Sequence, residues 1–230
     1  MHLRTALLFF LVGLMLSACG LSAQTVTENP ALPPGETATS AVCPPEVACA
    51  PCPSEVPPTA AAMPELANLA DVGTLAIKAL AQHDFARLAE LAHPQKGIRF
   101  SPYPYVSDDQ VVLMADELSS AYSDTTSRLW GHYDGSGEPI QLTFAEYFER
   151  FIYSADFANP EQIGYNKVLQ EGNSINNIPE YYPQAEFVEY HFSGFDPQYE
   201  GMDWQSLRLV FEKVDGRYYL VGIVHAEWTI

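Results

Sequence analysis

Apolar residues recur at helical spacing after a proline-rich N-terminal segment. A helix with about 3.6 residues per turn would place on one face Leu66, Leu69, Gly73, Ala76, Ile77 and Leu80. The pattern predicts a helix that opens at Pro64-Glu65 and breaks at His83-Asp84. Asp84 can then cap a second short helix over residues 85–92, because its carboxylate can accept a backbone N–H of the first turn.

Short apolar or alternating runs follow and predict strands over residues 97–100, 110–114, 128–133, 140–142 and 185–192. A polar patch over 115–122 is predicted to be helical, and residues 153–184, with scattered Asn and Pro, are predicted to be irregular. Thr143 and Glu146 form a capping box and predict a helix start there. The apolar face of that helix would carry Phe144, Tyr147, Phe148 and Phe151.

The C-terminal segment reads as a hairpin around Asp215-Gly216, because this dipeptide is typical of tight β-turns. The register that we expect pairs Leu209 with Gly222 and Phe211 with Leu220. It places on the core face Leu207, Leu209, Phe211, Leu220 and Val224. It places on the opposite face Arg208, Glu212, Tyr219, His225 and Glu227.

These elements predict an α+β domain over residues 65–230, with N-terminal helices packed on a curved antiparallel sheet. Two stretches of it, AQHDFARLAEL ending at Leu91 and LVFEKVDGRYYLVGI ending at Ile223, resemble the first and last parts of NTF2-like domains. The resemblance implies a cone with a pocket between helices and sheet. Members of that superfamily include enzymes, binding modules and dimers, so the fold by itself does not settle the function.

The same segments are similar to those of bacterial lipoproteins. The N-terminal sequence also has the pattern of a lipoprotein signal peptide. A basic start at Arg4 precedes an apolar run from Ala6 to Leu16, which is shorter than the about 20 residues that span a bilayer. The run predicts a secretory signal peptide over residues 1–18. Leu16-Ser17-Ala18-Cys19 resembles the lipobox, which implies cleavage before Cys19 and lipid on its thiol; an ordinary signal peptide with an incidental cysteine is the alternative. We therefore expect an extracytoplasmic protein, anchored to the cell membrane or to an outer membrane where there is one.

Residues 19–64 hold ten of the 18 prolines and show no hydrophobic periodicity, so they predict a disordered tether. Its cysteines Cys43, Cys49 and Cys52 are disulfide candidates in an oxidising compartment, and the odd one could pair between chains. A redox-active or metal-binding C-x-x-C at Cys49 and Cys52 is the alternative.

Charge narrows the classes of partner. Residues 65–230 contain 25 acidic and 10 basic side chains, a net charge of −15 with histidine neutral. Such a domain is repelled by nucleic acid and by anionic lipid, but it suits a cationic ligand, a divalent cation or a basic protein. The sequence contains no phosphate loop, nucleophile elbow or metal-ligand cluster, so we predict no cofactor and no metal.

Two groups of side chains are candidates for chemistry. His132 and Asp134 flank Tyr133 beside a turn, where a carboxylate could orient an imidazole for acid–base work. Ligand-binding candidates are Tyr103, Tyr105, Trp130 and Tyr147, which could instead be core residues. Alternating oxygen side chains at Asp134, Ser136 and Glu138 suggest calcium, but Pro139 stands where an EF-hand loop needs glycine.

The sequence favours a non-catalytic module that binds a small ligand or an envelope protein. The first alternative is a hydrolase or isomerase built on His132 and Asp134. The second is a structural homodimer formed through the sheet face that would carry Tyr219 and His225.

Overall fold

The computed structural model describes residues 64–229. The predicted signal peptide, the predicted lipidation site at Cys19 and the disulfide candidates Cys43, Cys49 and Cys52 lie outside the described residues. Within the described part of the chain, no helix has the length and apolar character needed to cross a membrane.

The helical elements of the domain are η1 (Pro64–Ala67), α1 (Leu69–Ala81), α2 (Phe85–Leu91), α3 (Ala115–Ala121), α4 (Phe144–Tyr147), η2 (Phe148–Ile152), α5 (Ile178–Tyr181) and η3 (Pro197–Tyr199). The strands are β1 (Ile98–Ser101), β2 (Val112–Leu113), β3 (Arg128–His132), β4 (Pro139–Leu142), β5 (Gln162–Tyr165), β6 (Glu186–Phe192), β7 (Gln205–Val214) and β8 (Arg217–Glu227). The predicted α+β class is confirmed.

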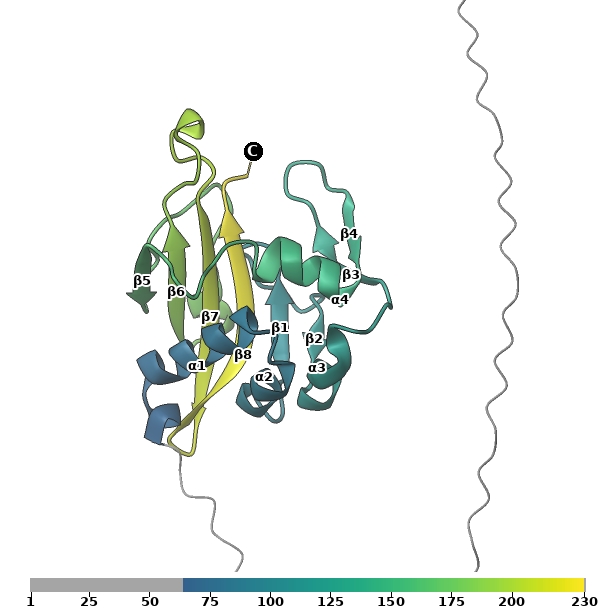
Figure 1. Cartoon of the computed structure of the whole chain (residues 1–230), viewed down its shortest axis with the longest axis vertical. Helices are drawn as coiled ribbons and strands as arrows, with labels where there is room; N and C mark the ends of the chain where they lie inside the picture. Colours follow the sequence, from purple (N-terminus) through teal and green to yellow (C-terminus); the bar gives the residue numbers. More distant parts are fainter. Residues whose placement is uncertain (1–63, 230) are drawn as a thin grey trace, which may run out of the picture. The chain divides into compact units, whose positions relative to one another are not determined.

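A six-stranded sheet in the order β2-β1-β8-β7-β6-β5 forms the centre of the domain. Neighbouring strands are antiparallel except β1 and β8, which run parallel. The prediction of a purely antiparallel sheet is therefore wrong at this one pair. The strands β3 and β4 form a separate hairpin beside it. Figure 1 shows α1 and α4 on the same side of the sheet, with α1 crossing β6, β7 and β8.

Local capping sets the helix boundaries. The long helix begins at Leu69, not at Pro64, because the Asn68 side chain accepts the N–H of Ala70 at 2.8 Å and so caps the start there. The cap predicted for Asp84 is confirmed, since its carboxylate accepts the N–H of Arg87 at 2.9 Å. The capping box predicted at Thr143 is confirmed as well.

Two apolar clusters cover the two faces of the sheet. The larger one lies under the helices and contains most of the buried aromatic side chains. The smaller one lies on the other face, below the segment that contains α5, and includes Val106, Ile178, Tyr182, Phe187, Val210, Val221 and Val224. The segment predicted to be irregular, 153–184, therefore includes an edge strand, β5, and a short helix that covers the sheet.

The hairpin turn at Asp215-Gly216 is confirmed, but part of the predicted register is wrong. Phe211 pairs with Leu220 as expected, whereas Leu209 pairs with Ile223, because a β-bulge shifts the register beside Val210. Beyond the bulge, each β8 side chain therefore lies on the face of the sheet opposite to the one that the predicted register gave it. His225 and Glu227 consequently lie on the helix-covered side, together with Leu207.

The burial of His225 follows from this shift. Its side chain is completely buried, and it contacts the ring of Phe151 at a centroid distance of 5.9 Å. Tyr219 lies on the opposite face, where it pairs with Glu212. The predicted dimer face that carried both Tyr219 and His225 therefore does not exist.

Candidate functional site

Three tyrosine rings and two aspartates line one cavity at the end of β1, beside the β3–β4 hairpin. Its volume is about 330 Å³. The loop after β1 contributes Pro102, Tyr103, Tyr105, Ser107, Asp109 and Gln110, and the hairpin contributes Gly131, His132, Tyr133 and Asp134, with Ser174 completing the lining. We call this cavity the tyrosine pocket.

A β-bulge in β3 shapes the hairpin side of the pocket. Leu129 pairs with Gln141 and His132 with Pro139, so two residues of β3 stand opposite Ile140 alone. One of them is Gly131, whose φ of 139° is a backbone conformation that side-chain-bearing residues rarely adopt. The bulge brings His132, which is exposed, to the pocket lining.

Packing and hydrogen bonds fix the tyrosines. The ring centroids of Tyr103 and Tyr133 lie 5.9 and 6.1 Å from the ring centroid of Phe151, so both rings pack against the same buried side chain. Tyr105 is 55% exposed, and its carbonyl oxygen accepts the side-chain amide of Gln110 at 3.0 Å. The pocket thus has two supported rings and a third that is open to solvent.

Asp134 connects three segments of the chain. One carboxylate oxygen accepts the hydroxyls of Ser174 and Thr229, both at 2.7 Å, and the other accepts the N–H of Gly135 at 3.1 Å. These bonds, that of Thr229 foremost, hold the pKa of Asp134 below its usual value. Its donors are thus Ser174, Thr229 and Gly135, and among the described residues no hydrogen bond joins it to His132, as the predicted pairing would require.

Asp109 is the second carboxylate. It accepts the hydroxyl of Ser107, and this bond is the main reason that its pKa lies below the usual value. His132 adds a smaller effect in the same direction. Among the described residues that line the pocket there is no Lys or Arg. At neutral pH the pocket therefore carries two ionised carboxylates and no permanent positive charge.

A partly buried ionic cluster lies behind the tyrosines. Arg150 donates to both carboxylate oxygens of Glu227, at 2.6 and 3.2 Å, and its guanidinium stacks 4.5 Å from the ring of Phe151. His225 Nε2 lies 3.3 Å from Glu227. Burial by itself would raise the pKa of Glu227, but the contacts with His225 and Arg150 outweigh it and lower the pKa to about 2.

The structure brings together four of the six residues that the sequence suggested for catalysis or ligand binding: Tyr103, Tyr105, His132 and Asp134. Trp130 and Tyr147 lie in the core, where their rings stack 4.0 Å apart at 15°. The indole N–H of Trp130 donates to the carbonyl of Leu142 at 2.9 Å. The resemblance to NTF2-like domains implies a pocket between the helices and the sheet. In this structure buried aromatic side chains such as Trp130 and Tyr147 fill that space.

Sequence reasoning missed Asp109, Tyr133 and Ser174 as pocket residues. Tyr133 lies between the two predicted catalytic residues His132 and Asp134, and this position in the sequence could have indicated that it lines the pocket. Asp109 and Ser174 reach the pocket from loops whose paths depend on distant contacts, so spacing could not reveal them. Within residues 64–229, no group of three or more His, Cys, Asp or Glu side chains is placed to hold a metal ion.

Comparison with known proteins gives distant structural likenesses. No protein-family model matches the chain, and no curated protein matches it. A protein named Rd1NTF2_05 with five substitutions is 13% identical, at a TM-score of 0.29, over 67% of this chain and 92% of its own. A DUF4783 family protein from Bacteroides ovatus is 9% identical, with a TM-score of 0.26. The match covers 68% of this chain and 94% of that protein.

A third solved structure is a putative calcium/calmodulin dependent protein kinase II association domain from Xanthomonas campestris. It is 12% identical, with a TM-score of 0.27, and the match covers 66% of this chain and 79% of that one. TM-scores and identities this low establish neither a shared fold nor a function.

Proposed function

We propose that this protein is a membrane-anchored binding module whose tyrosine pocket takes a small organic cation. The observation that carries the proposal is the combination of three tyrosine rings and two ionised aspartates in a cavity whose described lining has no Lys or Arg. The pocket volume, about 330 Å³, lies at the lower end of the roughly 300–1,000 Å³ that small-molecule sites occupy.

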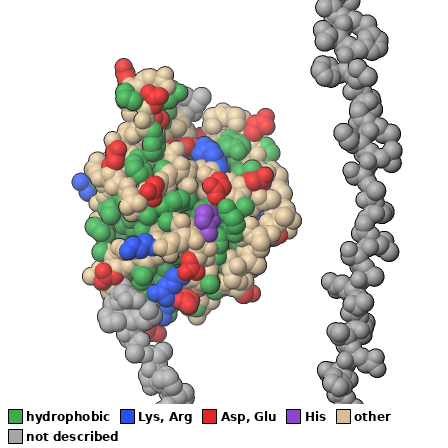
Figure 2. Space-filling view, viewed as in Figure 1, with side chains coloured by type: hydrophobic (Ala, Val, Ile, Leu, Met, Phe, Trp, Pro, Cys, Tyr) green, Lys and Arg blue, Asp and Glu red, His purple; other side chains and the backbone are tan. Residues whose placement is uncertain are grey.

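The chemistry of the lining favours a cation over a neutral or anionic ligand. The face of a tyrosine ring attracts an ammonium group by about 0.5–2 kcal/mol, more as the site loses water. Ionised Asp109 and Asp134 add Coulombic attraction that a neutral ligand of the same shape does not receive. The domain as a whole is acidic, and Figure 2 shows acidic side chains scattered over the face that it displays. Such a field raises the encounter rate with cations.

The anchor and the fold family are part of the proposal. The lipobox-like motif at Cys19 and the proline-rich composition of the residues that follow it support a domain that is held outside the cytoplasm by a lipid anchor. The sequence resemblance at the two ends of the domain supports an NTF2-like fold. Labelled fatty acid should be incorporated into the wild-type chain and not into Cys19→Ser; equal labelling of both would reject the anchor.

The ligand claim is tested by calorimetric titration of the full chain in neutral detergent with tetramethylammonium chloride. Tyr105→Ala removes the exposed ring and should weaken binding by about 3- to 30-fold. Tyr199→Ala is the matched control, because Tyr199 is 49% exposed and lies outside the pocket. Binding that is absent in the wild type, or equally affected by both variants, would contradict the proposal.

An acid–base enzyme is the second candidate, and one observation keeps it in view. His132 lines the pocket and lies close enough to Asp109 to lower the pKa of that carboxyl. Asp134, the partner that the sequence suggested, is bonded to Ser174 and Thr229 instead. Turnover of a cationic ester or amide that His132→Ala abolishes would favour this function over simple binding.

A further inference from the structure

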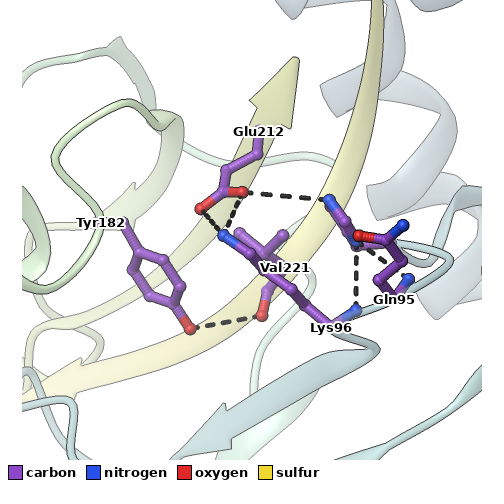
Figure 3. Close-up of polar contacts among 6 residues, drawn as sticks. Gln95, Lys96, Tyr182, Glu212 and Val221 are labelled. Atoms are coloured by element: carbon purple, nitrogen blue, oxygen red, sulfur yellow. Dashed lines mark hydrogen bonds and ion pairs between the residues drawn. The ribbon is translucent and has the colours of Figure 1, made fainter. Parts of the chain in front are cut away.

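A second cavity lies on the outer face of the sheet, where α5 covers it. Its volume is about 480 Å³, and it is lined by Lys96, Arg99, Asp108, Tyr181, Tyr182 and Val221. Figure 3 shows the Lys96 side chain extending across Val221 to the carboxylate of Glu212, and the hydroxyl of Tyr182 directed at the carbonyl of Val221. The domain has ten basic residues against 25 acidic ones, yet two of the ten meet in this lining. We call it the basic pocket.

Lys96 is held in place but open to solvent. Its ammonium contacts both carboxylate oxygens of Glu212, at 2.8 and 2.5 Å, while 55% of its side chain remains exposed. The turn that carries it is fixed by His93, whose Nδ1 accepts the backbone N–H groups of Gln95 and Lys96 at 3.2 and 3.1 Å. An Nδ1 that accepts these bonds carries no proton, so the neutral ring presents its Nε2–H toward Glu212, 3.9 Å away.

Arg99 is fixed through one of its nitrogens. Nη1 donates to the carbonyls of Ser107, Asp108 and Gln110, at 2.9, 3.2 and 3.1 Å. The guanidinium also lies 5.4 Å from the centre of the Tyr181 ring, and the hydroxyl of that ring donates to Asp108. A guanidinium whose position is set in advance loses little side-chain entropy when a ligand binds to it.

We propose that the basic pocket binds a small carboxylic acid with a flat apolar body. The planar guanidinium matches the geometry of a carboxylate, and Lys96 supplies a second positive charge to the same cavity. The rings of Tyr181 and Tyr182, with Val221, give the rest of the ligand an apolar surface. Asp108 and Glu212 repel further negative charge, so a monoanion suits the pocket better than a phosphate dianion.

The loop of residues 107–110 separates this cavity from the tyrosine pocket. Asp108 faces the basic pocket, whereas Ser107, Asp109 and Gln110 line the tyrosine pocket. The two cavities are therefore neighbours with opposite charge preference. A carboxylate probe reports on one and an ammonium probe on the other, so either proposal can fail without the other.

The test is a calorimetric titration of the full chain with benzoate, with benzamide as the neutral probe of the same shape and inorganic phosphate as the dianionic probe. We expect saturable benzoate binding that is at least about tenfold tighter than benzamide or phosphate binding. Lys96→Gln should weaken it by about tenfold or more, and Lys96→Arg, which keeps the charge, should retain it.

Lys167→Gln serves as the control. Lys167 is exposed and lies outside both pockets, so its loss changes the overall charge alone. This variant should leave benzoate affinity within about twofold of the wild type. Absent binding, equal binding of benzoate and benzamide, tighter phosphate binding, or equal loss in Lys96→Gln and Lys167→Gln would each overturn the proposal.

Discussion

The hydroxyl of Thr229 donates a hydrogen bond of 2.7 Å to a carboxylate oxygen of Asp134, across 95 positions of the chain. The same oxygen accepts the hydroxyl of Ser174. Three segments that are remote in sequence thus meet at one carboxylate in the wall of the tyrosine pocket. The arrangement supplies the pocket with a fixed negative charge and closes the hairpin side against the end of β8.

Thr229→Val should loosen this junction. The substitution keeps the shape of the side chain and removes the donor, and a net hydrogen bond contributes about 1 kcal/mol. We expect the free energy of unfolding to fall by about that amount or less, since Asp134 is exposed, and tetramethylammonium affinity to fall with it. Urea denaturation and calorimetry measure the two effects. Unchanged values for both would show that the bond does not organise the pocket.

The buried ion pair between Arg208 and Glu189 should be the most sensitive point of the outer sheet face. Arg208 Nε lies 3.0 Å from Glu189, and the side chains are 1% and 0% exposed. Arg208→Met leaves a buried carboxylate without its partner, which destabilises proteins by about 3–5 kcal/mol. The double variant Arg208→Met with Glu189→Leu should recover much of that loss in urea denaturation. A double variant as unstable as the single one would contradict the electrostatic explanation.

Acid should weaken the domain through Glu227. Its pKa is about 2 in the folded state against an ordinary value of 4.5. A depressed carboxyl pKa contributes stability that is complete above the ordinary value and is lost as pH falls from 4.5 toward 2. The contribution is at most about 3 kcal/mol. Denaturation at several pH values should show the wild-type advantage over Glu227→Gln shrinking across this window; a constant advantage would refute the assignment.

Cation binding in the tyrosine pocket should resist mild acid. The hydroxyls of Ser107 and Thr229 hold the pKa values of Asp109 and Asp134 below the ordinary 3.8, so both carboxylates stay ionised at pH 5. Affinity for tetramethylammonium should therefore depend little on aspartate ionisation down to about pH 4 and fall below it. A decrease in affinity that Asp109→Asn removes, and that is centred well above pH 4, would contradict these ionisation states.

The local signals in the sequence were reliable where neighbours in the chain decide the structure. Asp84 and the Thr143 capping box start helices as predicted, and Asp215-Gly216 turns the last hairpin, since in each case the deciding bonds span only a few residues. The register of that hairpin was not predictable, because one extra residue beside Val210 moves His225 from the outer face into the core.

The pockets illustrate the same limit. Tyr103 and His132 could be singled out by residue type, but their meeting depends on the bulge at Gly131 and on long-range bonds to Asp134. Trp130 is a ligand-binding candidate by the same criterion, but its ring stacks on Tyr147 in the core. The sequence therefore names candidate side chains, whereas packing across the sheet decides which of them reach solvent together.

The central claim, a pocket selective for a positive charge, is tested most directly by one pair of ligands. Choline and 3,3-dimethylbutan-1-ol have nearly the same shape and differ in the charge at the branched end. Calorimetric titration of the full chain should show choline binding at least about tenfold more tightly, with the difference reduced in Asp109→Asn. Equal affinities for the two, or a preference for the neutral alcohol, would contradict the account.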